Sequence, residues 1–194
     1  MLATSKISQS SLKNLEFHQV EWEVQQLQNL GLLLDNSNIK QVVFKRNKFD
    51  QGCLSEVSEI LKRNRVIKEI MFSESCVRNV GAAFLASALK ESDCLEELQI
   101  WENSIGSKGA EELSKMIEVN STLKSLTIFD SSSITATPLV SAVLARNRTM
   151  EFTFGVAKRE TRVLKWLSLC RETAHLESTG LMFQVLVGLL ALWG

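Results

Sequence analysis

A short pattern of apolar residues recurs at nearly constant intervals along most of this 194-residue chain. In each copy, an apolar residue is followed by a second apolar residue three positions later and by a third after two more. The copies begin at Leu12, Ile39, Ile67, Leu95 and Leu123, so that successive starts lie 27, 28, 28 and 28 residues apart. Self-similarity at a fixed period of about 20–29 residues indicates an array of like structural units, each built from a short strand and a helix.

Other positions of the unit repeat together with this pattern. The ninth residue of four units is polar, namely Asn47, Ser75, Asn103 and Ser131. We expect this side chain to lie buried where the chain leaves the strand, because Asn and Ser can bond backbone groups that are free at such a turn. Apolar pairs at helical spacing follow, and we expect them to be buried as well. These pairs are Val57 with Leu61, Leu85 with Leu89, and Leu113 with Ile117.

The ends of the expected helices carry a further column of polar residues. Asn36, Asn64 and Asn120 each lie three residues before the next unit begins, and Ser92 stands at the same place in its own unit. Asparagine adopts the left-handed conformation more readily than most residues, so we expect it to end the helix in that conformation. Asn120 also begins an N-x-S/T sequon, but its place in this column favours a structural role over glycosylation.

The fold class follows from these columns. The 28-residue period, the asparagine at the ninth position and the glycine at the fifteenth, Gly81 and Gly109, resemble the ribonuclease-inhibitor class of leucine-rich repeats. One such unit cannot bury its apolar face alone, whereas stacked units share a continuous core. We therefore expect an α/β leucine-rich-repeat solenoid, with a short, curved parallel sheet on the concave side and helices on the convex side.

The repeat pattern divides the chain into three parts. Residues 1–11 form an N-terminal extension, residues 12–155 a leucine-rich-repeat domain of about five repeats, and residues 156–194 a helical C-terminal tail. The pattern decays from Met150 onward, since Thr153 and Gly155 stand where apolar residues belong. Too few residues precede Leu12 to cover the apolar edge of the first unit, so the sequence suggests a piece of a longer array.

The C-terminal tail ends in a largely apolar run, from Leu181 to Trp193. This run is shorter than the roughly 20 residues that span a bilayer, and no basic residues flank it. A terminal helix docked on the protein is the favoured interpretation. The alternatives are a tail inserted in a membrane and an artefact of a truncated reading frame.

Composition limits the classes of function. The chain has 22 basic and 22 acidic residues, and a net charge of zero gives no support to nucleic-acid binding. The four cysteines, Cys53, Cys76, Cys94 and Cys170, show no metal-like spacing, so we expect buried, reduced thiols and no metal or other cofactor. The first residues lack the apolar core of a signal peptide, which predicts a cytoplasmic protein.

We expect function on the concave side of the sheet, where the third, fifth and seventh residues of each unit point away from the core. Trp101 and Phe129 should lie side by side there, and exposed aromatic residues flanked by charge are typical of protein-binding hot spots. The predicted partner-binding residues, some of them at the eighth position, are Val43, Lys45, Arg46, Glu69, Met71, Glu74, Glu97, Gln99, Trp101, Glu102, Phe129 and Asp130. Ordinary solvated strand residues, or burial of the two rings under the C-terminal tail, are the alternatives.

Charge is unevenly distributed over the predicted binding surface. Acidic residues gather around its aromatic end, whereas the second position of the units carries a basic row. The basic row consists of Lys13, Lys40, Lys68 and Lys124. A cationic partner segment with an apolar anchor would suit the acidic, aromatic end.

Enzymatic function finds little support in the sequence. The two histidines, His18 and His175, lie at no known catalytic spacing from a nucleophile. The segment from Gly106 to Gly109 lacks the frame of a phosphate-binding loop and fits an ordinary turn into a helix. We therefore predict a non-enzymatic protein-protein interaction scaffold that binds a protein and no small-molecule substrate. A GTPase-activating protein of the Ran-activator type and a truncated product without independent function are the alternatives.

The run from Ser11 to about Met150, and most closely the stretch from Leu95 to Gly106, resembles the repeat region of a family of intracellular plant proteins. In that family the repeats precede a Ras-like GTPase domain, which has no counterpart in this sequence. The resemblance implies a regulator of plant development that acts in patterned cell division, leaf and vein patterning and auxin transport. It supplies no catalytic residue for any position of this sequence.

Overall fold

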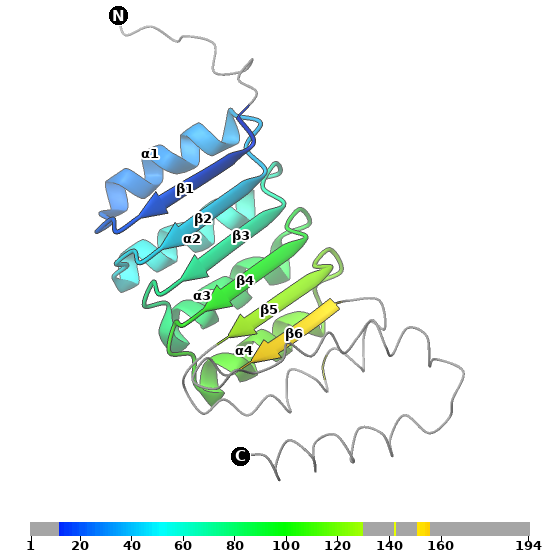
Figure 1. The fold of residues 1–194 in the computed structure, drawn as a ribbon. Coiled ribbons are helices and arrows are strands. Elements are labelled where there is room, and N and C mark those ends of the chain that lie inside the picture. Colours follow the sequence, from blue (N-terminus) through cyan, green and yellow to red (C-terminus); the bar gives the residue numbers. More distant parts are fainter. Residues whose placement is uncertain (1–11, 130–141, 143–150, 156–194) are drawn as a thin grey trace, which may run out of the picture.

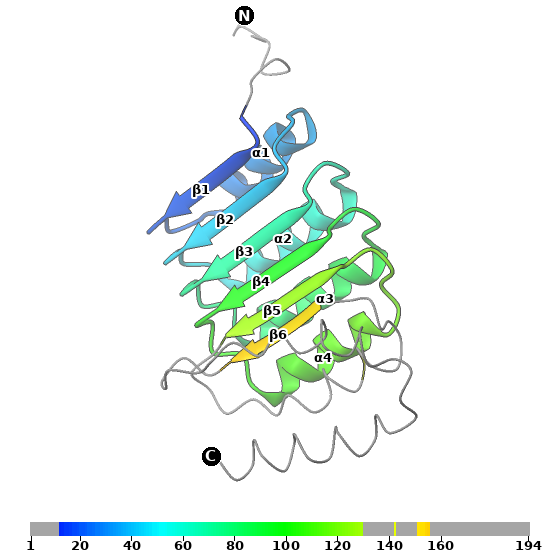
Figure 2. The same ribbon diagram turned by 45° about the vertical axis from the view of Figure 1, so that its right-hand side comes forward.

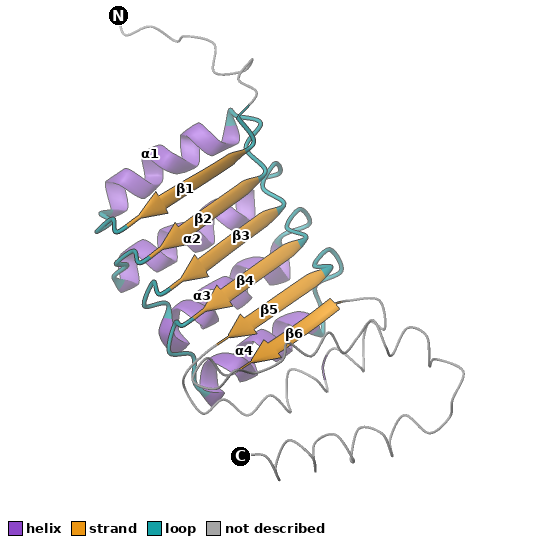
Figure 3. Cartoon of the chain, viewed as in Figure 1, coloured by secondary structure: helices purple, strands orange, loops and turns teal. Residues whose placement is uncertain are grey.

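The computed structural model describes residues 12–129, 142 and 151–155. Within them, short strands alternate with helices along most of the chain, as the repeat period predicts (Figure 1 and Figure 3). The strands are β1 (Asn14–His18), β2 (Gln41–Lys45), β3 (Glu69–Ser73), β4 (Glu97–Trp101), β5 (Ser125–Phe129) and β6 (Glu151–Gly155). The helices are α1 (Val24–Asp35), α2 (Gln51–Arg63), α3 (Arg78–Glu91) and α4 (Ser107–Ile117).

The strands form one parallel sheet in the order β1-β2-β3-β4-β5-β6. Each strand pairs with the strand of the next unit at the same repeat position, so that Gln41 pairs with Glu69 and Glu69 pairs with Glu97. Helices α1 to α4 all lie on one face of the sheet (Figure 1 and Figure 2). The predicted α/β leucine-rich-repeat solenoid, with strands in one layer and helices in the other, is thus confirmed.

The apolar residues that define the repeat form the core between the sheet and the helices. From the second unit to the fifth, the residues at the first, fourth and sixth positions are at most 3% exposed. Phe17, Phe44 and Phe72 stack across β1, β2 and β3, with ring centroids 5.5 and 5.3 Å apart. The predicted helix pairs are buried too. Side chains from neighbouring units therefore share one continuous core, which a single unit could not provide.

The polar residue at the ninth position is buried, as predicted, and it bonds the strand ends of neighbouring units together. Asn103 is 1% exposed, and its amide nitrogen donates to the carbonyl oxygens of Phe72 and Trp101. Its side-chain oxygen accepts from the backbone N–H groups of Ser75 and Val77, at 3.0 and 3.3 Å. One side chain thereby bonds four backbone groups from two neighbouring units.

The same ladder continues toward the N-terminus through Ser75 and Asn47. The Ser75 hydroxyl donates to the carbonyl oxygen of Ser73 at 2.8 Å and accepts from the backbone N–H of Asn47 at 3.2 Å. The Asn47 amide donates to the carbonyl oxygen of Phe17, and its oxygen accepts from the indole N–H of Trp22. Every turn in this series is therefore bonded to the unit on at least one side of it.

The residues that end the helices do not adopt the predicted left-handed conformation. Asn64 has φ −71° and ψ 137°, and its side-chain oxygen accepts from the backbone N–H groups of Val66 and Ile67, both at 2.8 Å. Asn120 forms the same pair of bonds in its own unit, and its amide nitrogen donates to the carbonyl oxygen of Leu89. Asparagine suits this column because its side chain bonds the backbone, not because of its tolerance for left-handed angles.

Left-handed residues recur instead at the eighth position, directly after β1, β2, β3 and β4, and three more, Cys76, Arg78 and Ser104, lie two to four residues beyond that position. Gln19, Arg46, Glu74 and Glu102 have φ angles between 49° and 55°. A non-glycine residue in this conformation costs about 1–2 kcal/mol. The bonds of the ninth residue hold the turn in place, so the eighth and ninth positions act together at the end of each strand.

Glycine at the fifteenth position lets neighbouring helices approach closely. A β-carbon built at Gly109 in α4 would lie 2.9 Å from Oδ1 of Asn79 and 3.0 Å from the β-carbon of Ala82, both in α3. That Asn79 oxygen accepts from the backbone N–H groups of Gly106 and Gly109, at 2.7 and 3.0 Å. The beginning of α4 is thus bonded to the helix of the preceding unit.

The repeat does not decay at Met150 as predicted, because a sixth strand follows at a shorter interval. The core positions of β5, Leu126 and Ile128, are in register with Phe152 and Phe154 of β6. Counting from Met150 assigns Thr153 and Gly155 to those positions, one residue too far along the chain. A shift of one residue exchanges the two faces of a strand. The apolar pattern was therefore missed because the interval between these two units is shorter than 28 residues.

The first unit is the least buried part of the described core. Leu12 is 49% exposed, whereas Leu15, Phe17 and Trp22 are partly buried and pack against the core. Trp22 contacts Phe17 edge-to-face, with ring centroids 4.9 Å apart. The indole ring therefore covers part of the apolar edge predicted for the first unit, while Leu12 stays exposed.

Several predicted features lie outside the described residues. They are the extension 1–11, the tail 156–194 with its apolar run, Asp130, Ser131, Cys170 and His175. In the part of the chain that the structure does describe, the longest helix, α3, has 14 residues and extends for about 21 Å. None of the helices described combines the length and the apolar character needed to cross a membrane.

The cysteines do not share one environment, contrary to the prediction of buried thiols throughout. Cys53 and Cys94 are buried and free, and their sulfur atoms lie within hydrogen-bonding distance of the carbonyl oxygens of Trp22 and Ile67. Burial is the main cause that raises the pKa of the Cys53 thiol to about 11. Cys76 is exposed, because it lies in the turn between β3 and α3.

We predict that Asn103→Ala lowers the free energy of unfolding by about 3 kcal/mol, because several buried backbone groups lose their only side-chain partner. The comparison is with Asn29→Ala, which removes an exposed amide on α1 that bonds only Gln25 at 3.5 Å. Urea unfolding followed by far-ultraviolet circular dichroism measures both. Equal midpoints for the two variants would show that the ninth position does not stabilise the fold.

We predict that iodoacetamide at pH 8 alkylates Cys76 in the folded protein while Cys53 and Cys94 remain protected. A thiol with a pKa of about 11 is ionised in only about one molecule in a thousand at pH 8, and only the thiolate reacts. Peptide mass spectrometry after brief labelling, with and without 6 M urea, gives the extent at each position. Rapid labelling of Cys53 without urea would contradict the described core.

Candidate functional site

The face of the sheet opposite helices α1 to α4, here called the front face, carries the third, fifth and seventh residues of each unit. Parallel register places residues of the same position side by side on neighbouring strands. The third-position row is Asn14, Gln41, Glu69, Glu97 and Ser125. The fifth-position row is Glu16, Val43, Met71, Gln99 and Thr127. The seventh-position row is His18, Lys45, Ser73, Trp101 and Phe129.

An aromatic pair stands out in the seventh-position row. Trp101 on β4 and Phe129 on β5 stack with ring centroids 4.6 Å apart and an interplanar angle of 21°. The indole N–H of Trp101 donates to the side-chain oxygen of Gln99 at 3.2 Å, and Gln99 donates in turn to the Glu97 carboxylate at 2.5 Å. Trp101 remains 36% exposed. Stacking and hydrogen bonding therefore hold an accessible indole in one orientation.

Two of the predicted partner-binding residues are too buried to offer much surface to a partner. Val43 is 3% exposed, because its register neighbours Glu16 and Met71 carry longer side chains on both sides of it. Phe129 is 9% exposed, and Trp101 stacks on one face of its ring. Both residues support the front face rather than form its contact surface.

Charged side chains on the β1 and β2 side of the front face pair with one another. Nζ of Lys45 lies 3.3 Å from Oε2 of Glu16, and Nε2 of His18 lies 3.0 Å from the same oxygen. The bonds to His18 and then to Lys45 hold the pKa of Glu16 below its ordinary value of 4.5. Nε of Arg46 lies 3.1 Å from Oε2 of Glu74. Exposed ion pairs of this kind contribute little stability and are easily exchanged for a partner's charges.

Three carboxylates over β3 and β4 have no cationic partner among the described residues, namely Glu69, Glu97 and Glu102. Glu69 accepts a neutral hydrogen bond from Gln41 at 2.8 Å, and Glu97 accepts one from Gln99. Glu69 and Glu97 are register neighbours on strands that lie about 4.8 Å apart. The front face therefore has an excess of negative charge beside the exposed indole.

Two of the four lysines in the predicted basic row at the second position, Lys68 and Lys124, are paired with a carboxylate. Glu96 occupies the same repeat position between Lys68 and Lys124, and its carboxylate accepts from them at 3.1 and 2.5 Å. The hydrogen bond from Lys124, followed by that from Lys68, holds the pKa of Glu96 below its ordinary value of 4.5. These charges line a cleft of about 380 Å³ at the end where the chain enters β3, β4 and β5.

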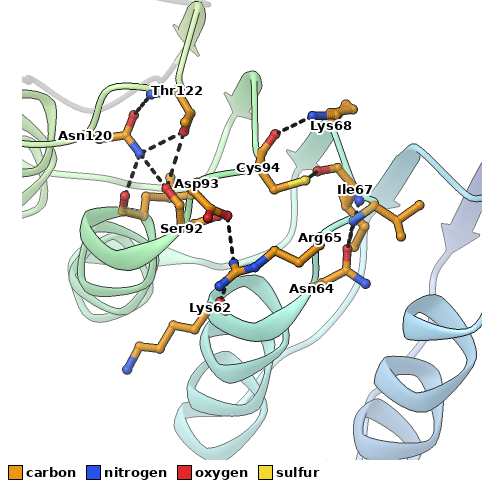
Figure 4. Close-up of polar contacts among 12 residues, drawn as sticks. Lys62, Asn64, Arg65, Ile67, Lys68, Ser92, Asp93, Cys94, Asn120 and Thr122 are labelled. Carbon is orange, nitrogen blue, oxygen red and sulfur yellow. Dashed lines mark hydrogen bonds and ion pairs between the residues drawn. The ribbon is translucent and has the colours of Figure 1, made fainter.

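Several other polar groups around this cleft are bonded within the protein itself (Figure 4). Nη1 of Arg65 lies 3.0 Å from Oδ1 of Asp93, which joins two neighbouring loops. Lys68 also donates to the carbonyl oxygen of Cys94 at 3.3 Å. Because its donors and acceptors already pair with one another, we assign the cleft a structural role in joining successive units.

The front face carries groups suited to noncovalent contacts. Among the described residues, no group of three His, Cys, Asp or Glu side chains is placed to hold a metal ion. His18 is exposed and bonds Glu16 rather than a nucleophile. What the face offers is an aromatic surface for stacking and carboxylates for pairing with cations.

Sequence reasoning missed the charge pairs that join residues one unit apart. These pairs are Arg46 with Glu74, Lys68 with Glu96, and Glu96 with Lys124. Comparing charges column by column would have found them, because the register of the sheet equals the repeat period. It also missed the importance of Ser73, whose short side chain stands next to Trp101 in the seventh-position row. The only sequence signal for this role is that serine is the smallest residue at the seventh position of the units.

The comparisons with known proteins support a relationship over a short stretch and a shared fold over most of the chain. No protein-family model matches the chain. Over 37 residues, 19% of its length, the chain is 64% identical to Protein TORNADO 1 of Arabidopsis thaliana, and it spans 3% of the length of that protein. Among solved structures it resembles Leiomodin-1 Actin-Binding Site 2 (ABS2), with a TM-score of 0.54 and 18% identity over 86% of this chain and 94% of that chain. At this level of identity, the second likeness shows the fold alone.

We predict that Glu96→Gln lowers the urea midpoint at pH 7, and that this loss becomes smaller as the pH falls below 4.5 toward pH 3. A carboxyl whose folded-state pKa lies below the ordinary 4.5 stabilises the fold fully above that value, and the contribution is lost as the pH falls through the folded-state pKa. Glu118→Gln, at an exposed glutamate after α4, is the control and should not lower the midpoint at either pH. An effect of Glu96→Gln that is equally large at pH 3 would rule out the ion pairs as its cause.

Proposed function

We propose that this chain is a non-enzymatic protein-interaction module that binds a partner protein on its front face. The observation that carries the proposal is the Trp101–Phe129 stack in the seventh-position row of the front face. An indole held by stacking and hydrogen bonds loses little conformational freedom when a partner packs on it, which favours binding. Tryptophan surrounded by polar residues is also the side chain most typical of binding hot spots.

The charge distribution supports a protein partner with cationic groups. The carboxylates of Glu69, Glu97 and Glu102 flank the indole without cationic partners among the described residues. The pairs of Lys45 with Glu16 and of Arg46 with Glu74 are exposed and can rearrange. We propose that the partner-binding surface consists of these residues together with Trp101, Gln99 and Met71, and that Val43 and Phe129 support it from below.

The short match to TORNADO 1 supports a narrower version of the proposal. We propose that the chain acts as a TORNADO 1-like regulator in plant development, with auxin-linked patterning as the process in which it takes part. The match covers 3% of the plant protein, so it bears on the repeat units and not on the rest of that protein. The repeat module would contribute partner binding to such a regulator.

We predict that Trp101→Ala weakens partner binding by about 30-fold or more, the range expected for a hot-spot tryptophan. The melting temperature should fall by only a few degrees, because the variant loses one stacking contact worth about 0.5–1.5 kcal/mol. Partners captured by the wild-type chain from plant extract are identified, produced in pure form and titrated by calorimetry.

Leu32→Ala is the matched control for this prediction. Leu32 is 62% exposed on α1, so the variant removes exposed apolar surface from the helix layer instead of the front face. It should bind each purified partner like the wild-type chain. A partner that binds Trp101→Ala and the wild-type chain equally well would place the interaction elsewhere on the molecule.

A further inference from the structure

We infer that the front face accepts an arginine side chain of its partner in a slot beside Trp101, an inference that rests on the proposed function of this face. The slot, here called the Ser73 slot, lies above Ser73 on β3, between Trp101 on β4 and Lys45 on β2. These three residues are consecutive members of the seventh-position row. The contacts of its two walls determine what the slot can hold.

The first wall is the free face of the indole. Trp101 has Phe129 and Ser73 as its register neighbours, and the stack on Phe129 covers the ring face that points toward β5. The opposite face points toward β3, where the serine side chain is too short to cover an indole. The exposed fraction of Trp101, 36%, is consistent with one open ring face.

The second wall of the slot is Lys45, and its charged end points away from the slot. Lys45 directs its ammonium group toward β1, where it lies 3.3 Å from the Glu16 carboxylate. The guanidinium of Arg46 is bound to Glu74. Neither Lys45 nor Arg46, the residue that follows β2, therefore lies against the indole, and the width of one strand remains between Lys45 and Trp101.

The charge around the Ser73 slot is negative. Glu102 follows Trp101 directly in the chain, and Glu97 is linked to the indole through Gln99. Neither carboxylate has a cationic partner among the described residues. A cation that enters the slot thus meets a ring face and carboxylates together, which is the combination that favours cation–π contact.

Arginine fits this geometry better than lysine or a methylated ammonium. A guanidinium is planar, stacks flat on one aromatic face and can still donate from its edge to carboxylates. A quaternary ammonium is recognised by several rings arranged as a cage, whereas the Ser73 slot has one ring face. Lysine places a compact, strongly hydrated charge over the ring and gains less from stacking.

The neighbouring Glu69 and Glu97 of the third-position row predict where a second cation of the partner segment binds. Glu97 and Trp101 are the third and seventh residues of one unit, so they are separated by about 13 Å along β4. An extended partner segment advances by the same distance in four residues. Arginines four residues apart would therefore reach the Ser73 slot and the neighbouring Glu69 and Glu97 carboxylates at once.

The test uses the whole chain and a synthetic peptide, acetyl-Gly-Arg-Ser-Gly-Ser-Arg-Gly-amide. The indole ¹H–¹⁵N signal of Trp101, assigned by its loss in Trp101→Phe, is followed during titration, with the Trp22 signal as an internal reference because its N–H is bound to Asn47. We expect saturable movement of the Trp101 signal alone. Affinity should fall about threefold or more when lysine replaces both arginines, and binding should vanish with neutral citrulline.

Variants separate the ring from the charge, with binding followed by fluorescence of a labelled peptide. Trp101→Leu should weaken binding about tenfold or more, while Trp101→Phe should restore part of it because a ring face returns. Glu102→Gln and Glu97→Gln should each weaken binding and reduce its dependence on salt. Glu118→Gln, distant in the chain at the end of α4, should bind like the wild-type chain.

A peptide with leucine and phenylalanine in place of the two arginines distinguishes this inference from the proposed function. If the neutral peptide moves the Trp101 signal and the arginine peptide does not, the front face binds partners but the arginine slot is wrong. If lysine and citrulline peptides bind as well as the arginine peptide, the inference is also overturned. If known partners bind through Trp101 but compete with neither peptide, the slot is not their anchor.

Discussion

The structure depends on how the chain leaves each strand. The eighth residue turns the chain in a left-handed conformation, and the ninth residue, buried beneath the strand ends, bonds carbonyl and N–H groups of its own unit and of the preceding one. Because Asn103 reaches the strand end of the preceding unit as well as its own, the turn of one unit is completed by the next. The parallel register follows from these bonds, and the columns of the front face are aligned by the same register.

Regular packing on one side of the sheet leaves the other side free to vary. The core positions are nearly uniform from unit to unit, whereas the seventh position changes from histidine to lysine, serine, tryptophan and phenylalanine. A small residue beside a large one creates a recess without any change in the backbone. Excess carboxylates on the same two strands then give the recess its preference for cations. Binding chemistry thus arises from differences between units in a fold that is set by their likeness.

Much of the fold could be predicted from the sequence, because the core columns and the ninth-position ladder repeat at one period. A register error hid the apolar pattern of β6, since starting the sixth unit at Met150 placed that pattern one residue too far along the chain. The site was predicted less well. Adjacency of Trp101 and Phe129 followed from the period, but the burial of Val43 depends on the lengths of its neighbours' side chains. The pairing of Glu96 with two lysines likewise depends on comparing units, not on any one unit.

Because the hydrogen bonds and ion pairs described above join residues of adjacent units, the number of units can change during evolution. Duplicating or deleting one complete unit would recreate the same interface on both sides of the change, because each unit bonds to its neighbours in the same way. The intervals of 27 residues between β1 and β2 and of 26 between β5 and β6 arise between strands, where an altered length leaves the pairing intact. Gene duplication could therefore lengthen this array without disturbing its packing, and each new copy would bring a seventh position open to mutation.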